Sequence, residues 1–122
     1  MNHKKRHHFK KLLLAELRLH AQYINDEQAR ALDIGNDDAN SDLALQQVIQ
    51  ELALKLGDRE SKVVADIDQA LMRMNEGSYG VCVRCGREID ERRLEALPTA
   101  RYDAVCQAEI EAAKGLGAGP SL

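Results

Sequence analysis

The sequence predicts a mostly α-helical protein made of a long antiparallel coiled-coil hairpin, a small globular head and a C-terminal helix. Aromatic residues make up 3% of the 122 residues and charged residues 30%, which suits long helices with a narrow apolar stripe better than a thick core. Apolar residues recur at helical spacing over residues 9–31 and again from residue 42 to about residue 75. A pair of cysteines and a third cysteine follow the second segment.

The predicted hairpin covers residues 9–75 and follows a basic N-terminal arm, residues 1–8, which contains His3, His7 and His8. The arm is expected to be a frayed, solvated terminus, and contact with phosphate or with an acidic partner is the alternative. No Pro or Gly interrupts the helical pattern of residues 9–31. Residues 33–42 are rich in Asp and Asn and contain Gly35, which predicts a turn at the tip of the hairpin.

The second helix of the hairpin is expected to run from about residue 42 to residue 75. Asn40 or Ser41 is suited to cap its N-terminus, and Asp42 is favourable in its first turn. Gly57 lies inside this helix and costs about 1 kcal/mol relative to Ala, so it is the weak position of the segment. The apolar seam of the helix consists of Leu45, Ile49, Leu52, Leu56, Val63, Ile67, Leu71 and Met74.

Four aspartates gather at the predicted tip of the hairpin, namely Asp33, Asp37, Asp38 and Asp42. Acidic residues in a turn and at a helix N-terminus stabilise the backbone without any further role. At the end of a long hairpin, the same carboxylates are also well placed to reach a basic or metal-containing site in a partner. The residues alone leave both interpretations open.

The head, residues 76–114, is built around a Cys-x-x-Cys pair, Cys82 and Cys85, followed by Gly86. This pattern is typical of a small zinc-finger-like site, because the two thiolates sit on a tight turn and glycine lets the backbone fold beneath the metal. A second Cys-x-x-Cys would fall on Asp103 and Cys106, where a carboxylate replaces the first thiolate. Since carboxylate oxygens also bind zinc, Cys82, Cys85, Asp103 and Cys106 are candidate ligands of a structural Zn²⁺.

Other interpretations of these four residues stay open. The thiols could simply pack as small apolar side chains. Asp103 is also suited to cap a last helix from residue 104 to about Lys114, which would compete with its use as a ligand. A redox role for Cys82 and Cys85 lacks the usual βαβ context, and neither a general base nor a substrate pocket points to a catalytic zinc. Residues 115–122 are expected to form a flexible tail.

Charge and hydropathy exclude several classes of protein. The net charge of −3 does not favour sequence-specific DNA binding and fits a basic protein surface better. The chain contains no apolar run of about 18 residues, as a membrane-spanning helix requires, and its N-terminal apolar stretch is too short for a signal peptide. We expect a cytoplasmic, monomeric protein that is not an enzyme. In a reducing compartment, its three cysteines favour metal binding or free thiols over disulfides.

Specific runs carry a resemblance to a known family: Glu76 to Gly86, Ile89, Arg92 to Ala100, and Cys106 with Gln107. Their glycines, cysteines, Arg-Leu-x-Ala-x-Pro run and spacings are similar to those of the DksA/TraR family of bacterial transcription regulators. The resemblance covers residues 42–114 well and the first helix only in pattern. The length resembles that of a short paralogue, here with a degenerate zinc-finger motif.

The resemblance implies a transcription factor that inserts its coiled coil into the secondary channel of RNA polymerase and modulates transcription initiation. Family members often act together with the alarmone ppGpp in the stringent response. Asp42-Leu43-Ala44 matches the second half of the family's Asp-x-x-Asp-x-Ala tip pattern, and Asp38 lies one place from the first half. The resemblance therefore implies that Asp38, Asp42 and Ala44 approach the active centre of the polymerase. It also implies that Arg59 lies near a ppGpp-dependent interface.

Two rival functions also follow from the residues. One is a zinc-ribbon-like nucleic-acid-binding module, and the other is a plain helical adaptor. The nucleic-acid module would need a basic face around the cysteines, but acidic residues are interleaved with the basic ones there. The basic residues in question are Arg84, Arg87, Arg92, Arg93 and Arg101.

Overall fold

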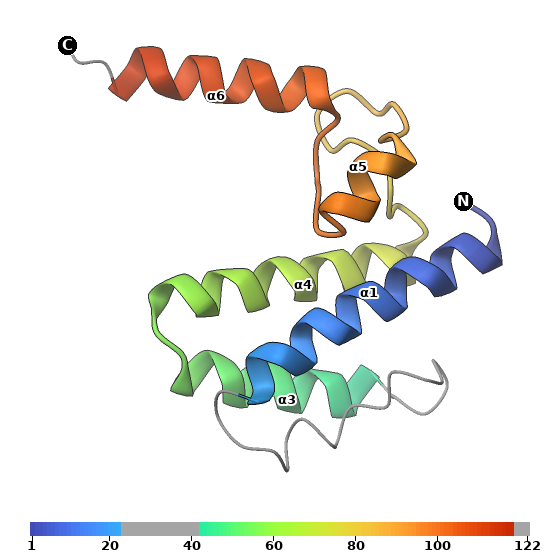
Figure 1. Ribbon diagram of the computed structural model, residues 1–122, viewed down its shortest axis with the longest axis vertical. Coiled ribbons are helices and arrows are strands. Elements are labelled where there is room, and N and C mark those ends of the chain that lie inside the picture. Colours follow the sequence, from blue (N-terminus) through green and yellow to red (C-terminus); the bar gives the residue numbers. More distant parts are fainter. Residues whose placement is uncertain (23–41, 119–122) are drawn as a thin grey trace. The chain divides into compact units, whose positions relative to one another are not determined.

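The computed structural model describes residues 1–22 and 42–118, so residues 23–31 of the first predicted helix and residues 33–41 of the predicted tip, with Asp38 among them, lie outside the described residues. The chain divides between Tyr79 and Gly80 into two compact units. Among the described residues, helices α1 (His3–Gln22), α3 (Asp42–Lys55) and α4 (Asp58–Glu76) belong to the first unit, and α5 (Glu91–Ala96) and α6 (Ala104–Ala118) belong to the second (Figure 1). The predicted mostly α-helical class with a helical hairpin is confirmed.

In the first unit, α1 and α3 both pack against α4 (Figure 1). Near the end of α4, the rings of Phe9 and Tyr79 lie 5.9 Å apart, so the start of α1 meets the residues that follow α4. Most of the predicted apolar seam is buried here. The buried apolar residues are Phe9, Leu13, Leu14 and Leu17 of α1, Leu45, Val48, Ile49 and Leu52 of α3, and Val64, Ile67, Ala70, Leu71 and Met74 of α4.

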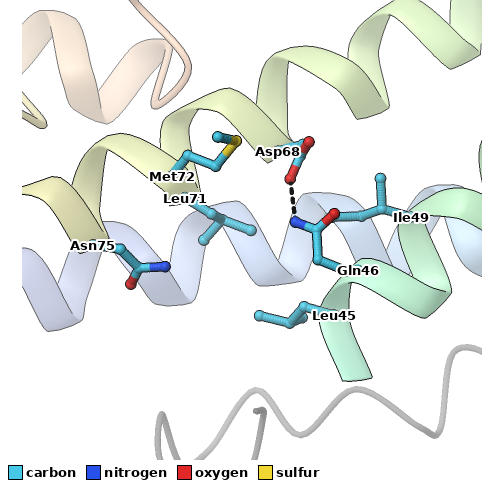
Figure 2. Close-up of a pocket in the computed structure, with 7 residues that line it drawn as sticks. All are labelled: Leu45, Gln46, Ile49, Asp68, Leu71, Met72 and Asn75. Atoms are coloured by element: carbon cyan, nitrogen blue, oxygen red, sulfur yellow. Dashed lines mark hydrogen bonds between the residues drawn. The ribbon is translucent and has the colours of Figure 1, made fainter. Parts of the chain in front are cut away.

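A shallow groove of about 210 Å³ runs between α3 and α4. Gln46 Nε2 donates a hydrogen bond to Asp68 Oδ1 at 2.9 Å across it (Figure 2). Both side chains are half-buried, so this bond satisfies polar groups at the rim of the apolar contact between the two helices. The bond joins two residues that are 22 positions apart and adds a polar contact to the apolar packing of the two helices.

The prediction of one helix from residue 42 to residue 75 is wrong at a single point. Helix α3 ends at Lys55 and α4 begins at Asp58, and the chain reverses between them so that the two helices pack on each other. Gly57 takes an extended conformation, with φ −70° and ψ 173°, and occupies the N-cap position of α4. The weak position noted in the sequence therefore lies in the connection between two helices, directly before the second one.

Ser61 stabilises this reversal. Its hydroxyl lies 3.3 Å from the carbonyl oxygens of both Ala53 and Leu56, which belong to the last turn of α3 and to the connection. Carbonyl groups at a helix C-terminus lack partners within the helix and need such donors. The Ser61 amide also donates to Gly57 O at 2.9 Å, which closes the first turn of α4. A residue of α4 thus completes the end of α3.

The basic segment at the start of the chain is helical rather than frayed. Asn2 caps α1, because its Oδ1 accepts a hydrogen bond from the Lys5 amide at 2.8 Å and its carbonyl accepts one from the Arg6 amide at 3.0 Å. Residues 3–8 therefore form the first turns of α1.

The end of α4 agrees with the sequence. Gly77 has φ 80°, and its amide donates to Met74 O at 3.3 Å, while the Ser78 amide donates to Arg73 O at 2.9 Å. This pair of bonds is the Schellman motif, in which a left-handed residue, usually Gly, ends the helix.

The second unit contains helices α5 and α6. Asp90 caps α5 through a 2.8 Å hydrogen bond from the Arg92 amide to its Oδ1, and α5 ends before Pro98. Helix α6 begins at Ala104 as expected but continues to Ala118, so the first residues of the predicted tail are helical. None of the helices in the described parts of the chain has the length and apolar character needed to cross a bilayer.

The same substitution at two glycines should have opposite effects. We expect Gly57→Ser to raise the free energy of unfolding by about 0.5–1 kcal/mol, because Gly57 already has a backbone conformation that serine adopts and a serine hydroxyl can cap α4. Gly77→Ser should lower it by about 1–2 kcal/mol, because serine is strained at positive φ. Urea unfolding followed by circular dichroism measures both changes. Equal effects at the two positions would contradict the assigned roles.

Candidate metal centre

The first cysteine pair lies on a tight turn of a short hairpin. Val81 and Glu88 form an antiparallel bridge, and the Cys82 amide donates to Arg87 O at 2.8 Å. The Gly86 amide returns to Cys82 O at 3.0 Å, with Gly86 at φ 78°. Only glycine adopts this conformation readily, so Gly86 lets the backbone pass beneath the two sulfur atoms.

The other two candidate ligands come from the start of α6. Asp103 directly precedes the helix, and Cys106 lies in its first turn. The Val83 amide donates to Arg101 O at 2.8 Å and so joins the cysteine turn to the segment that leads into α6. The structure therefore brings together all four predicted ligands, although they are separated by up to 24 positions in the sequence.

The four ligand atoms lie within 4.8 Å of one another. A tetrahedral zinc site with Zn–S bonds of about 2.3 Å and Zn–O bonds of about 2.0–2.2 Å places neighbouring ligand atoms about 3.5–3.8 Å apart. Three sulfur atoms and one carboxylate oxygen are also a donor set that Zn²⁺ accepts. The residues present therefore fit a structural Zn²⁺.

Asp103 uses its two carboxylate oxygens for two different tasks. Oδ1 accepts a hydrogen bond from the Cys106 amide at 2.7 Å, which caps α6. Oδ2 faces the cysteines and accepts from Cys85 Sγ at 3.0 Å. The competition between capping and metal binding that the sequence raised is thus removed, because each task has its own oxygen.

The local surroundings shift the pKa values of the four groups in different directions. Burial opposes ionisation of Cys82, but the amides of Cys85, Asp103 and Arg84 outweigh it and lower the pKa of this thiol to about 7. Burial raises the pKa of Cys106 to about 12. The hydrogen bond between Cys85 and Asp103 raises the pKa of the thiol and lowers that of the carboxyl. Because metal binding requires thiolates, it should release protons and weaken as the pH falls.

The other predicted site residues that the structure describes belong to helices of the first unit and not to the cysteine cluster. The backbone of Asp42 and Ala44 lies in the first turn of α3, and Arg59 lies exposed in the first turn of α4. Sequence reasoning missed one feature next to the cysteines, an ion pair between Arg84 and Glu109. These two residues are 25 positions apart, and no local spacing pattern connects them.

Substitutions of Asp103 should separate its two tasks. We expect Asp103→Ala to weaken Zn²⁺ binding by more than about tenfold, Asp103→Asn to weaken it less, and Asp103→Cys to preserve it, since cysteine restores a fourth thiolate. With a chelator present, the order changes: Asp103→Asn should keep the α6 cap, whereas the Ala and Cys variants should lose helix content.

Competition with a chromogenic chelator measures the zinc affinity, and far-UV circular dichroism in excess chelator measures the cap. If Asp103→Ala binds Zn²⁺ as tightly as the parent chain, Asp103 is not a ligand. If Asp103→Asn loses as much helix as Asp103→Ala, the capping role is wrong.

Comparisons with known proteins agree with this geometry. Residues 77–112 match a family model described as the prokaryotic dksA/traR C4-type zinc finger. Three of the four positions of such a site are cysteine here, and Asp103 stands at the other. Members of this family are transcription factors rather than enzymes, as expected from the sequence.

The relatives extend the similarity along most of the chain. The chain is 34% identical over 118 residues to the RNA polymerase-binding transcription factor DksA of Caulobacter vibrioides. The aligned residues cover 91% of this chain and 79% of that protein. With the protein of the same name from Escherichia coli it is 33% identical over 116 residues, or 91% and 74% of the two chains.

A solved structure shares the fold. The structure of transcription factor DksA2 from Pseudomonas aeruginosa aligns with a TM-score of 0.61 and 31% identity, over 93% of this chain and 88% of that one. The cysteine turn, the helical hairpin and the identity along most of the sequence point the same way, and the chain belongs to the DksA/TraR family.

Proposed function

We propose that this chain is a DksA-like transcription factor that binds RNA polymerase through the secondary channel and modulates transcription initiation. The observation that carries this proposal is the 34% identity, over 91% of the chain, to a protein named for binding RNA polymerase. The fold supports it as well, since it is shared with a solved structure described as transcription factor DksA2. Such a partner implies a cytoplasmic protein. That the chain is a short paralogue within the family stays a prediction.

In this proposal the segment around the start of α3 acts on the polymerase. Asp42 is the first residue of α3, and Asp38 precedes it by four positions. Their charge would act near the catalytic metal and basic loops of the polymerase, where electrostatic effects are strong. Ala44 would keep the segment narrow, because a larger side chain would clash with the channel.

Two further parts of the proposal concern ppGpp and zinc. Arg59 is exposed in the first turn of α4, where a guanidinium can reach a phosphate group. Cys82, Cys85, Asp103 and Cys106 would hold a structural Zn²⁺ that ties the cysteine turn to the start of α6. The chain would act as a monomer and without sequence-specific contacts to DNA.

A binding competition tests the channel directly. Purified RNA polymerase is captured by this chain in the presence of increasing amounts of another factor that occupies the secondary channel. Mutually exclusive binding is the expected result. Capture without competition would contradict the channel, and absence of capture would contradict the function as a whole.

Asp42→Asn should then abolish the effect on the lifetime of promoter complexes while leaving polymerase binding within about threefold of the parent chain, because the substitution removes charge but little volume. Asp58→Asn is the matched control, since Asp58 is likewise the first residue of a helix, α4. It should preserve both activities. If Asp42→Asn behaves like Asp58→Asn, the proposed role of this segment is wrong.

Arg59→Ala should remove the response to ppGpp and preserve the effect measured without ppGpp. Lys62→Ala is the control, because Lys62 is also an exposed cation of α4. Promoter-complex lifetimes with and without ppGpp measure both variants. An equal response of the two variants to ppGpp would rule out Arg59 as part of that interface.

A further inference from the structure

An ion pair lies beside the cysteine cluster. Arg84 stands between the two cysteines of the Cys-x-x-Cys pair in the sequence. Its guanidinium donates to Glu109 Oε2 on α6. The two side chains are 46% and 55% exposed, and ion pairs this exposed contribute little to stability. Stability alone is therefore a weak reason for this arrangement.

The same guanidinium lies beside candidate metal ligands. Arg84 and Glu109 line one cavity of about 320 Å³ together with Cys85, Asp103 and Cys106. Because a guanidinium is a rigid, planar fork with five N–H donors, Arg84 keeps donors for a ligand sulfur while it donates to Glu109.

Charge explains what this contact would do. Three thiolates and one carboxylate around a divalent ion leave two negative charges on the site, whereas protonated thiols are neutral. A positive N–H donor against a sulfur therefore favours the metal-bound form over the protonated form. Groups that donate to metal ligands in this way typically change metal affinity by about 10–100-fold.

We infer that Arg84, oriented by Glu109, is a positioning residue of the metal centre that holds Cys106 and offsets the negative charge of the ligand set. This inference rests on the proposed zinc site. It predicts that Arg84 acts on the metal through Cys106 and that Glu109 acts only through Arg84.

Four variants of the full chain test the inference by equilibrium competition for Zn²⁺ with a chromogenic chelator. Arg84→Gln should weaken Zn²⁺ binding by about 10–100-fold, and Arg84→Lys and Glu109→Gln should weaken it less. Arg92→Gln should leave it unchanged. Arg92 is the matched control because its side chain is 93% exposed and pairs with Asp90 outside the cluster.

The double variant Arg84→Gln/Glu109→Gln gives the sharpest result. If Glu109 acts only through Arg84, the double variant should bind Zn²⁺ no more weakly than Arg84→Gln alone. Additive losses would contradict that coupling. The thiolate-to-cobalt absorption band of the Co²⁺-loaded chain should also shift in Arg84→Gln and not in Arg92→Gln, which reports on the sulfur atoms independently of affinity.

Failure of this inference differs from failure of the zinc site. A parent chain that binds no Zn²⁺ would overturn the site and the inference together. A parent chain that binds Zn²⁺, with Arg84→Gln within about threefold of Arg92→Gln, would overturn the inference alone. Far-UV circular dichroism checks that the variants fold, and should Arg84→Gln not fold, Arg84→Lys against Arg92→Gln decides the question in its place.

Discussion

The carboxylate of Asp103 holds together two features that are distant in the sequence. One oxygen accepts from the Cys106 amide and starts α6, and the other accepts from Cys85 on the hairpin turn. The start of a helix and the cysteine turn therefore share one side chain, and the position of each depends on the other. A thiolate at this position, as in a four-cysteine site, has one ligand atom and would have to give up one of the two contacts. The replacement of cysteine by aspartate thus changes the mechanical connection of the head while it preserves the charge of the ligand set.

Much of this head could be predicted from the sequence because its signals are local. The Cys-x-x-Cys spacing, Gly86 and the matching position of Asp103 indicated the four residues that the structure brings together as candidate ligands, and Asp90 and Pro98 lie at the two ends of α5. The pair of Arg84 and Glu109 could not be predicted, because nothing in the chain between them indicates that a turn and a helix face would meet. The role of both Asp103 oxygens likewise depends on geometry that spacing does not contain.

The first unit shows the limit of periodicity. The apolar seam of residues 45–74 predicted the buried residues of α3 and α4 well, including Leu52 and Ile67. It did not predict that the chain reverses at Gly57. A glycine inside a helix costs only about 1 kcal/mol, so propensity alone cannot decide between a continuous helix and two packed ones. Tertiary contacts decide it here, since the Ser61 hydroxyl supplies a donor to the carbonyl groups at the end of α3 and α3 buries its apolar face on α4.

Because the chain reverses at Leu56 and Gly57, the length of α3 sets the distance between Asp42 and this turn. With 14 residues at about 1.5 Å each, α3 carries Asp42 about 21 Å along its axis from the point where the chain turns. One residue gained or lost in α3 would move Asp42 by only about 1.5 Å, but it would rotate Asp42 by about 100° around the axis. The direction in which this end of the helix faces a partner is therefore far more sensitive to the length of α3 than its reach is. Variation in this part of the chain is consequently expected in substitutions rather than in insertions or deletions.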